Sequence, residues 1–295
     1  MKKSIFIFLF LFFLLNSRIA FARPTMFGRL LGEKVSPTVI LSPLGRLMEF
    51  LDKKEVSPAP TLDKSGEVLG FSINKNFTPA VLTVAMLGDS MIDVLWESLP
   101  QLRTALEKYF PDTKLNLYNF GVGASNIEYA SFRLTQGYQY MGKSFPSVLS
   151  IKPDVLVLES FAYNNFGDNQ KGLDKQWLLI AEIIEKTKRI SPKTKIVLAS
   201  TIAPNSAVYG DGIDGIDWPL DQKKTRATTV KKYLENMINF AVSQGYPLAD
   251  AYHSSMDVNG EGKLEYISAS DNLHLSGPGG VLFCNKVAET ISSLW

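Results

Sequence analysis

The chain has 295 residues, 45% of them hydrophobic, which is enough apolar material for one large core or two smaller ones. Its 31 basic and 29 acidic side chains leave a formal net charge of only +2, so the charge gives no reason to expect nucleic acid as a partner. Two histidines and one cysteine, outside any HExxH or Cys/His cluster, give no basis for a disulfide framework, a metal or another cofactor.

Residues 1–22 have the organisation of a secretory signal peptide. Two lysines precede an apolar run at 5–15, and the segment closes on Ala-Phe-Ala at 20–22, which fits the small-x-small cleavage rule. The run is shorter than the roughly 20 residues of a membrane span. We therefore expect cleavage after residue 22, which removes three basic residues, changes the net charge from +2 to −1, and yields an exported protein without stable membrane insertion. The alternative is an uncleaved N-terminal anchor.

Residues 23–78 are mixed in character, and we interpret them as a tether or N-terminal extension rather than a domain. From residue 79 onward, apolar runs typical of strands alternate with amphipathic, helix-like stretches. Strands are expected at 80–87, 114–120, 154–160, 195–201 and 247–252. Helices are expected at 93–110, 127–141, 174–190, 225–244 and 277–295, with the lone Cys284 buried in the last one. This alternation predicts an α/β fold with a parallel sheet covered on both faces.

In such sheets the ligand lies outside the carboxyl ends of the strands. The first predicted strand is followed by Gly88-Asp89-Ser90, which is either a turn and nothing more or the placement of a reactive serine. A serine hydroxyl becomes a useful nucleophile only when a base removes its proton. The two histidines, His253 and His274, are the only plausible bases.

His274 is the stronger candidate, because Asp271 lies three residues before it in the same loop and could fix its tautomer. His253 has no comparable orienting carboxylate at short range, although Asp250 and Asp257 are near in the sequence. The plainer interpretation of His274 is a loop residue in front of the last helix.

A tetrahedral intermediate also needs hydrogen-bond donors aimed at its oxyanion. The natural candidates are the backbone N–H of Ser90, a backbone N–H of the Gly123-Ala124 turn, and the side-chain amide of Asn164. The alternatives are ordinary turn chemistry for the glycines and a turn or helix cap for the asparagine.

Four separated blocks, in this order along the chain, resemble those of the SGNH (GDSL-like) hydrolase superfamily. They are LGDSM (87–91), NFGVGAS (119–125), AYNN (162–165) and DNLH (271–274). The resemblance implies that residues 79–295 form a flavodoxin-like, three-layer α/β/α fold with an acyl-ester hydrolase site. In that site Ser90 would be the nucleophile, His274 the base and Asp271 its orienting acid. Asn164 would be the side-chain oxyanion donor.

Two details depart from the family pattern. Ala162 and Asn165 stand where the family often has Gly and Asp, at positions that are not catalytic. The glycine block is ambiguous: an ungapped alignment puts Ala124 on the usual oxyanion glycine, whereas a one-residue deletion puts Gly123 there. Either backbone N–H can serve.

The resemblance favours an exported serine esterase acting on a small-molecule or saccharide ester, with a short acyl group such as O-acetyl. A polysaccharide O-acetyltransferase using the same site is the alternative. A dinucleotide-binding protein is disfavoured because Asn126 occupies the third glycine position of the fingerprint, and the complete Ser/Asn/Asp/His set disfavours a binding protein with a decayed site. Acyl length is expected to depend on loops 125–145 and 203–222, where 210–222 is either a rim or lid or an ordinary surface loop.

Overall fold

The computed structural model describes residues 79–295; the predicted signal peptide (1–22) and extension (23–78) lie outside the described residues. A five-stranded parallel sheet forms its centre, with the order β2-β1-β5-β6-β7. The strands are β1 (Val81–Gly88), β2 (Lys114–Gly121), β5 (Val155–Glu159), β6 (Lys195–Ser200) and β7 (Leu248–Asp250). Counted among these five, the order is 2-1-3-4-5, which is the flavodoxin-like order expected from the resemblance.

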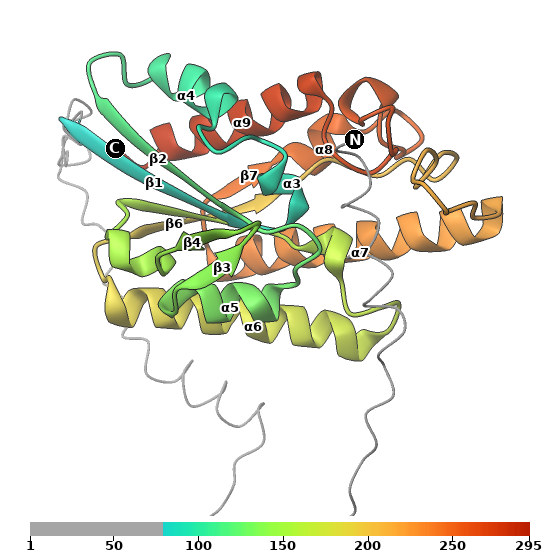
Figure 1. Cartoon of the computed structure of the whole chain (residues 1–295), viewed down its shortest axis with the longest axis horizontal. Helices are drawn as coiled ribbons and strands as arrows, with labels where there is room; N and C mark the ends of the chain where they lie inside the picture. The colour runs from blue at the N-terminus through green and yellow to red at the C-terminus, as the bar shows by residue number, and fades with distance from the viewer. Residues whose placement is uncertain (1–78) are drawn as a thin grey trace, which may run out of the picture. The chain divides into compact units, whose positions relative to one another are not determined.

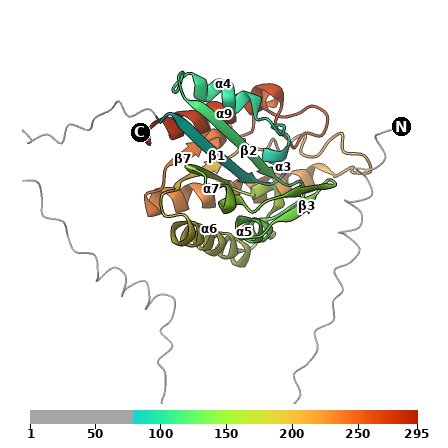
Figure 2. The same cartoon turned by 60° about the vertical axis from the view of Figure 1, so that its left-hand side comes forward.

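Helices cover both faces of this sheet, as Figures 1 and 2 show from two directions. One face carries α4 (Pro100–Glu107) and α9 (Gly277–Ser292), and the other carries α5 (Ile127–Thr135), α6 (Gln170–Ile190) and α7 (Leu220–Gln244). Side chains of β1 alternate between the two cores: Val84 and Met86 pack on the α4/α9 side, and Ala85 and Leu87 on the α5/α6 side. The three-layer α/β/α prediction is confirmed.

Short elements complete the described part of the chain. They are α3 (Ser90–Asp93), α8 (Ala251–Ser255), the antiparallel strands β3 (Tyr138–Tyr140) and β4 (Lys143–Phe145), and the 3-10 turns η1 (Val148–Ile151), η2 (Ala162–Asn164) and η3 (Leu264–Tyr266). Cys284 of α9 is buried, as expected. Within residues 79–295, no helix is both long enough and apolar enough to cross a membrane.

The structure corrects three predicted boundaries. The helix expected at 93–110 is interrupted, because α3 ends at Asp93 and the backbones of Trp96 and Leu99 are left-handed (φ 67° and 49°). Helix α4 begins only at Pro100, and a proline is well tolerated at the first position of a helix. The strand expected at 247–252 ends at Asp250, whose carboxylate accepts the N–H of His253 and starts α8.

The third correction concerns the helix expected at 127–141. Helix α5 ends at Thr135, and the remaining residues enter the β3–β4 hairpin. The hairpin turns through Met141 and Gly142, both with positive φ (49° and 75°), as a two-residue turn compatible with strand twist requires. Methionine is an unusual residue in that conformation, so the apolar pattern suggested a continued helix instead.

Candidate active site

Ser90 lies at the carboxyl edge of the sheet, in the turn between β1 and α3. Asp89 caps α3, since its Oδ1 accepts the N–H of Met91 over 2.8 Å. A Cβ atom on Gly88 would come within 2.1 Å of Ile92 Cγ1, so the turn needs glycine there to fold back tightly on the strand. Ser90 itself stays partly exposed while Asp89 is fully buried.

Asn164 reaches the same turn from the end of β5. It closes η2, and its Nδ2 donates to Oδ2 of Asp89 over 2.8 Å. An amide nitrogen carries two hydrogens, so this bond leaves one free for another acceptor. Burial raises the pKa of Asp89, and the hydrogen bonds from Asn164 and Met91 oppose that rise. The switch point of the strand order lies between β1 and β5, so Ser90 and Asn164 lie at the part of the sheet edge where such folds bind ligands.

The glycine block follows β2 and packs against α3. A Cβ atom on Gly121 would lie 2.2 Å from the backbone nitrogen of Asp93, so only glycine permits this approach. The side chain of Asn119 binds both segments: its Nδ2 donates to the carbonyls of Ile92 (2.8 Å) and Trp96 (3.0 Å), and its Oδ1 accepts the N–H of Gly121 (2.7 Å).

The two candidate donors of this block differ in the structure. The N–H of Gly123 donates to the hydroxyl of Tyr140 over 3.0 Å and is therefore already engaged. Ala124 is exposed and has a left-handed backbone (φ 55°), a conformation that favours glycine, and its N–H has no hydrogen-bond partner among residues 79–295. The geometry therefore favours Ala124, the position given by the ungapped alignment.

Asp271 and His274, the residues predicted to act as acid and base, are hydrogen-bonded to each other. Oδ2 of Asp271 lies 2.9 Å from Nδ1 of His274, while its Oδ1 accepts the N–H groups of Leu273 (2.9 Å) and His274 (3.0 Å). Burial alone would lower the pKa of His274, but the hydrogen bond and charge of Asp271 and the charges of Asp89 and Asp93 outweigh it, so this pKa is raised. Burial tends to raise the pKa of Asp271, but the three hydrogen bonds that its carboxylate accepts outweigh burial, so this pKa is lowered.

The charges of Asp89 and Asp93, which lie one residue before and three residues after Ser90, both act on His274, as expected if the imidazole faces the turn that holds Ser90. No hydrogen bond between Ser90 and His274 occurs in the described part of the chain. In unliganded active sites such catalytic hydrogen bonds are often long.

His253 differs from the prediction. Oδ2 of Asp250 lies 2.6 Å from its Nδ1, so His253 does have an orienting carboxylate three residues before it. The expectation that His274 alone is so equipped is wrong. What separates the two is position: Asp250 ends β7, which is three strands from β1, or about 14 Å at normal strand spacing. The His253 side chain is also 53% exposed, against 30% for His274.

Loop 210–222 contacts the loop that holds Asp271 and His274. The side chain of Asn272 donates to the carbonyl of Asp211 over 2.9 Å, and an ion pair of Asp211 with Lys223 (2.5 Å) connects this loop to α7. Asn272 has a left-handed backbone (φ 49°), which these contacts hold in place. Gly212 also packs closely on the backbone of Ser270 and Asp271, so residues 210–212 support the start of the loop that holds His274.

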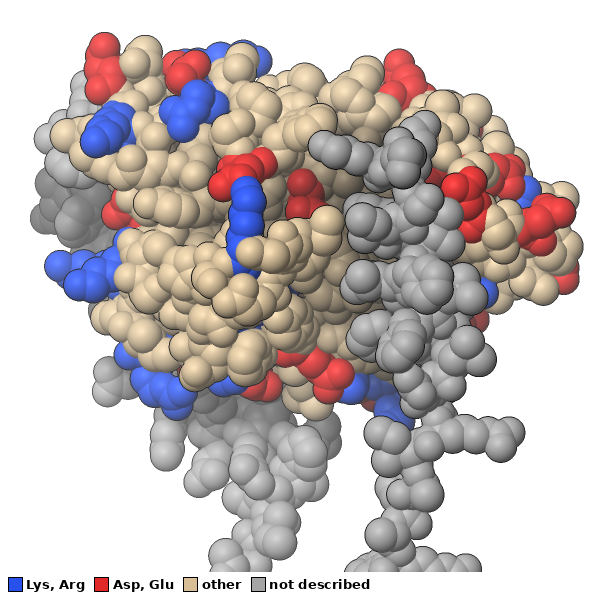
Figure 3. Space-filling model, in the orientation of Figure 1, with Lys and Arg blue, Asp and Glu red and all other residues tan. Residues whose placement is uncertain are grey.

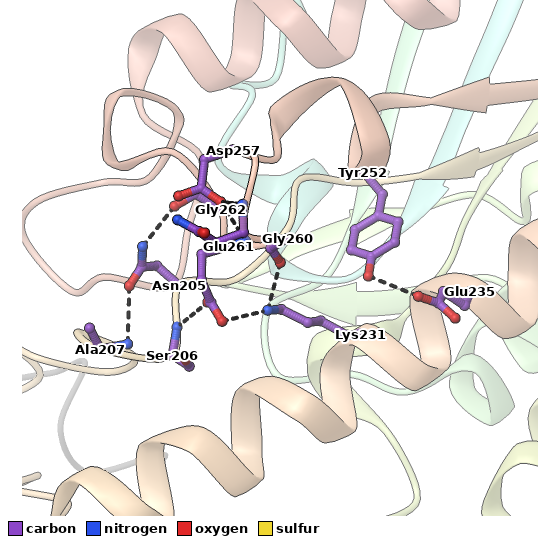
Figure 4. Close-up of polar contacts among 11 residues, drawn as sticks. Asn205, Ser206, Ala207, Lys231, Glu235, Tyr252, Asp257, Gly260, Glu261 and Gly262 are labelled. Atoms are coloured by element: carbon purple, nitrogen blue, oxygen red, sulfur yellow. Dashed lines mark hydrogen bonds and ion pairs between the residues drawn. The ribbon is translucent and has the colours of Figure 1, made fainter.

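A polar cluster anchors residues 260–262, which precede the loop that holds Asp271 and His274 (Figure 4). Lys231 of α7 contacts Oε1 of Glu261 (2.9 Å) and the carbonyl of Gly260 (2.8 Å), and Oε2 of Glu261 accepts the N–H of Ser206 (2.8 Å). The Lys231 ammonium thereby balances the charge of Glu261. Among residues 79–295, no group of three or more His, Cys, Asp or Glu side chains is arranged to hold a metal ion.

Comparisons with known proteins identify the fold. No family model matches the chain. No curated protein matches it either. Among solved structures, it is similar to a lipase/acylhydrolase from Enterococcus faecalis (15% identity, TM-score 0.50, covering 72% of this chain and 96% of that one). The chain has the fold of the SGNH (GDSL-like) hydrolases.

Two further solved structures are similar to this chain to the same extent. A GDSL-like lipase from Bacteroides thetaiotaomicron has 15% identity and a TM-score of 0.50, covering 72% of this chain and 89% of that one. An acetylxylan esterase from Geobacillus stearothermophilus has 13% identity and a TM-score of 0.51, covering 72% and 95%. The family resemblance is confirmed at the level of the fold.

Sequence reasoning missed three residues around this candidate site. Asp93 and Tyr140 share a hydrogen bond beside the glycine block. Arg133 of α5 is fully buried and donates to the carbonyl of Gly88 (3.0 Å) and to Oγ of Ser125 (3.2 Å), so it joins the two turns from beneath. Asp93 could have been noticed as the residue one helical turn after Ser90. Nothing in the local pattern marks the other two.

Proposed function

We propose that this protein is an exported carboxylic ester hydrolase with Ser90 as its nucleophile. The observation that carries the proposal is the hydrogen bond of Asn164 to the turn that holds Ser90, at the carboxyl edge of the sheet. The Asp271–His274 pair, whose charge acts on Asp89 in that turn, supports it. The fold alone would support many functions, whereas this arrangement of nucleophile, base, acid and amide donor suits acyl transfer.

The reaction follows from the roles of these groups. Ser90 Oγ attacks the ester carbonyl as Nε2 of His274 takes its proton, and Asp271 stabilises the resulting imidazolium. The oxyanion is held by the N–H groups of Ser90 and Ala124 and by the free Nδ2 hydrogen of Asn164. His274 then protonates the departing alcohol. Water, activated by the same histidine, hydrolyses the acyl–Ser90 ester and restores the enzyme.

We propose a short acyl group, such as acetyl, on a saccharide or small alcohol as the substrate. The likeness to an acetylxylan esterase supports this class through the shared fold. On the face drawn in Figure 3, basic side chains are scattered among acidic ones without a continuous basic patch, which favours a weakly charged substrate over nucleic acid. The cleavable leader expected at residues 1–22 supports a location outside the cytoplasm.

Hydrolysis by the purified protein of aryl esters of graded acyl length, beside acetylated glycans, tests the function. Activity should be greatest with acetyl esters, and Ser90→Ala should abolish it. An inactive protein, or a fully active Ser90→Ala variant, would remove the proposal. Supplying a sugar acceptor in excess distinguishes the O-acetyltransferase alternative, because that enzyme would transfer the acyl group to the sugar faster than to water.

A further inference from the structure

Tyr140 of the β3–β4 hairpin joins two segments of the proposed active site. Its hydroxyl donates to Oδ2 of Asp93 over 2.7 Å and accepts the backbone N–H of Gly123 over 3.0 Å. Asp93 belongs to α3, the short helix that Ser90 opens. Gly123 directly precedes Ala124, the favoured backbone donor for the oxyanion. One phenol group therefore connects the nucleophile helix with the oxyanion loop.

The two connected segments have little freedom. The N–H of Asp93 donates to the carbonyl of Asp89 over 3.1 Å, so the position of Asp93 follows the turn that holds Ser90. The hydrogen bond from the N–H of Gly123 to Tyr140 fixes the peptide plane between Val122 and Gly123. Only the two backbone torsions of Gly123 separate that plane from the next one, which carries the N–H of Ala124. A shift of Tyr140 would thus displace an oxyanion donor relative to the nucleophile.

The direction of the two hydrogen bonds is fixed by charge. Burial and the neighbouring Asp93 carboxylate raise the pKa of Tyr140 to about 12, so the phenol keeps its proton and donates it to Asp93. The oxygen lone pairs are then available to Gly123, and donation to a carboxylate strengthens their acceptance of the N–H. A tyrosine that formed only packing contacts would not need either bond.

We propose that Tyr140 is a positioning residue that keeps the oxyanion loop in register with Ser90 through the Asp93–Tyr140–Gly123 hydrogen bonds. This inference rests on the proposed esterase function. A purely structural role would be to dock the hairpin. The hairpin, however, has a second attachment, the exposed ion pair between Lys143 and Glu97 (2.6 Å), and an internal stack of Tyr138 on Phe145 (5.1 Å between ring centres).

The test compares Tyr140→Phe with Lys143→Met. Tyr140→Phe removes one hydroxyl and keeps the ring, so the protein should fold while kcat for an aryl acetate falls about 10- to 100-fold, with KM nearly unchanged, as expected for a misplaced transition-state donor. Lys143→Met breaks the ion pair between the hairpin and Glu97 and should leave kcat unchanged. Thermal unfolding of both variants checks that each is folded at the assay temperature.

A double variant sharpens the test. Asp93→Asn combined with Tyr140→Phe should cost little more than Tyr140→Phe alone, because the groups act as one unit. An unchanged kcat in Tyr140→Phe, or an equal loss in Lys143→Met, would overturn the positioning role and leave the esterase function standing. An inactive unmodified protein, or an active Ser90→Ala variant, would instead overturn the esterase function and this inference together.

Discussion

The side chain of Asn164 donates to the buried carboxylate of Asp89 over 2.8 Å and so joins the end of β5 to the turn that holds Ser90. The two residues are 75 positions apart in the sequence, yet their contact holds the amide next to Ser90. A fixed amide is useful to an oxyanion because it needs no reorganisation when charge develops. Asp89 would then act by orienting Asn164 rather than by taking part in the chemistry.

Asn164→Ala should lower kcat about 10²- to 10³-fold and change KM little, because the lost hydrogen bond matters mainly in the transition state. Steady-state kinetics with an aryl acetate measures both constants. Asn165→Ala is the matched control: that amide donates to the carbonyl of Ala162 (2.8 Å) and should affect stability rather than kcat. Equal kcat values for Asn164→Ala and the unmodified protein would exclude Asn164 from the site.

The sequence was sufficient to predict the sheet and the edge at which the site lies. Five strand-like runs correspond to the five parallel strands. The inner strands β1, β5 and β6 are mostly buried and therefore almost entirely apolar, whereas the edge strand β2 is partly exposed and includes polar residues. The Asp271–His274 pair was predictable too, since its geometry is local. The same spacing occurs at Asp250 and His253, so the preference for His274 cannot rest on spacing. It rests on the charges of Asp89 and Asp93, which act on His274, and on the distance of β7 from β1.

The rest of the site depends on contacts between distant segments. Tyr140 lies 47 residues from Asp93, and it reaches that carboxylate only because a hairpin turns through Met141. Arg133 resembles an ordinary polar residue of an amphipathic helix in the sequence, whereas the structure buries it against backbone carbonyls. Tertiary packing determines where both side chains lie, and the local sequence around each residue does not predict it.

The mature protein should begin at Arg23 and be found outside the cytoplasmic membrane. The small-x-small sequence at 20–22 behind the apolar run at 5–15 motivates this prediction. N-terminal sequencing of the protein recovered from the extracytoplasmic fraction is the direct measurement. Recovery of exported protein with residues 1–22 intact would favour the anchor instead.

The two histidines should differ sharply in their effect on catalysis. Ser90→Ala and His274→Ala should each abolish esterase activity, and the double variant should lose little more than either single one, because the two groups act together. His253→Ala should retain most activity, even though Asp250 orients that imidazole. Activity in His274→Ala together with loss in His253→Ala would show that we have assigned the base to the wrong histidine. The Gly88-Asp89-Ser90 segment would then be a simple turn.

The acid limb of the pH profile should report on His274. The imidazole must be neutral to accept the proton of Ser90, and its pKa is raised above 6.5 because Asp271, Asp89 and Asp93 together outweigh burial. The value of kcat/KM should therefore increase with pH through an apparent pKa above 6.5. A limb centred below 6.5 would contradict this charge arrangement.

Replacing Asp271 by Asn removes the negative charge and hydrogen-bond acceptor that do most to raise this pKa. The apparent pKa of His274 should therefore decrease, and the acid limb should move to lower pH. Turnover should also decrease, by about 10⁴-fold on the serine-protease precedent, because the amide holds the imidazole in the wrong tautomer. Asp250→Asn is the matched control, because it alters the same Asp-x-x-His arrangement at His253. It should change neither the apparent pKa of the acid limb nor kcat. A pH profile that responds to Asp250→Asn and not to Asp271→Asn would show that the imidazole acting on Ser90 is not His274.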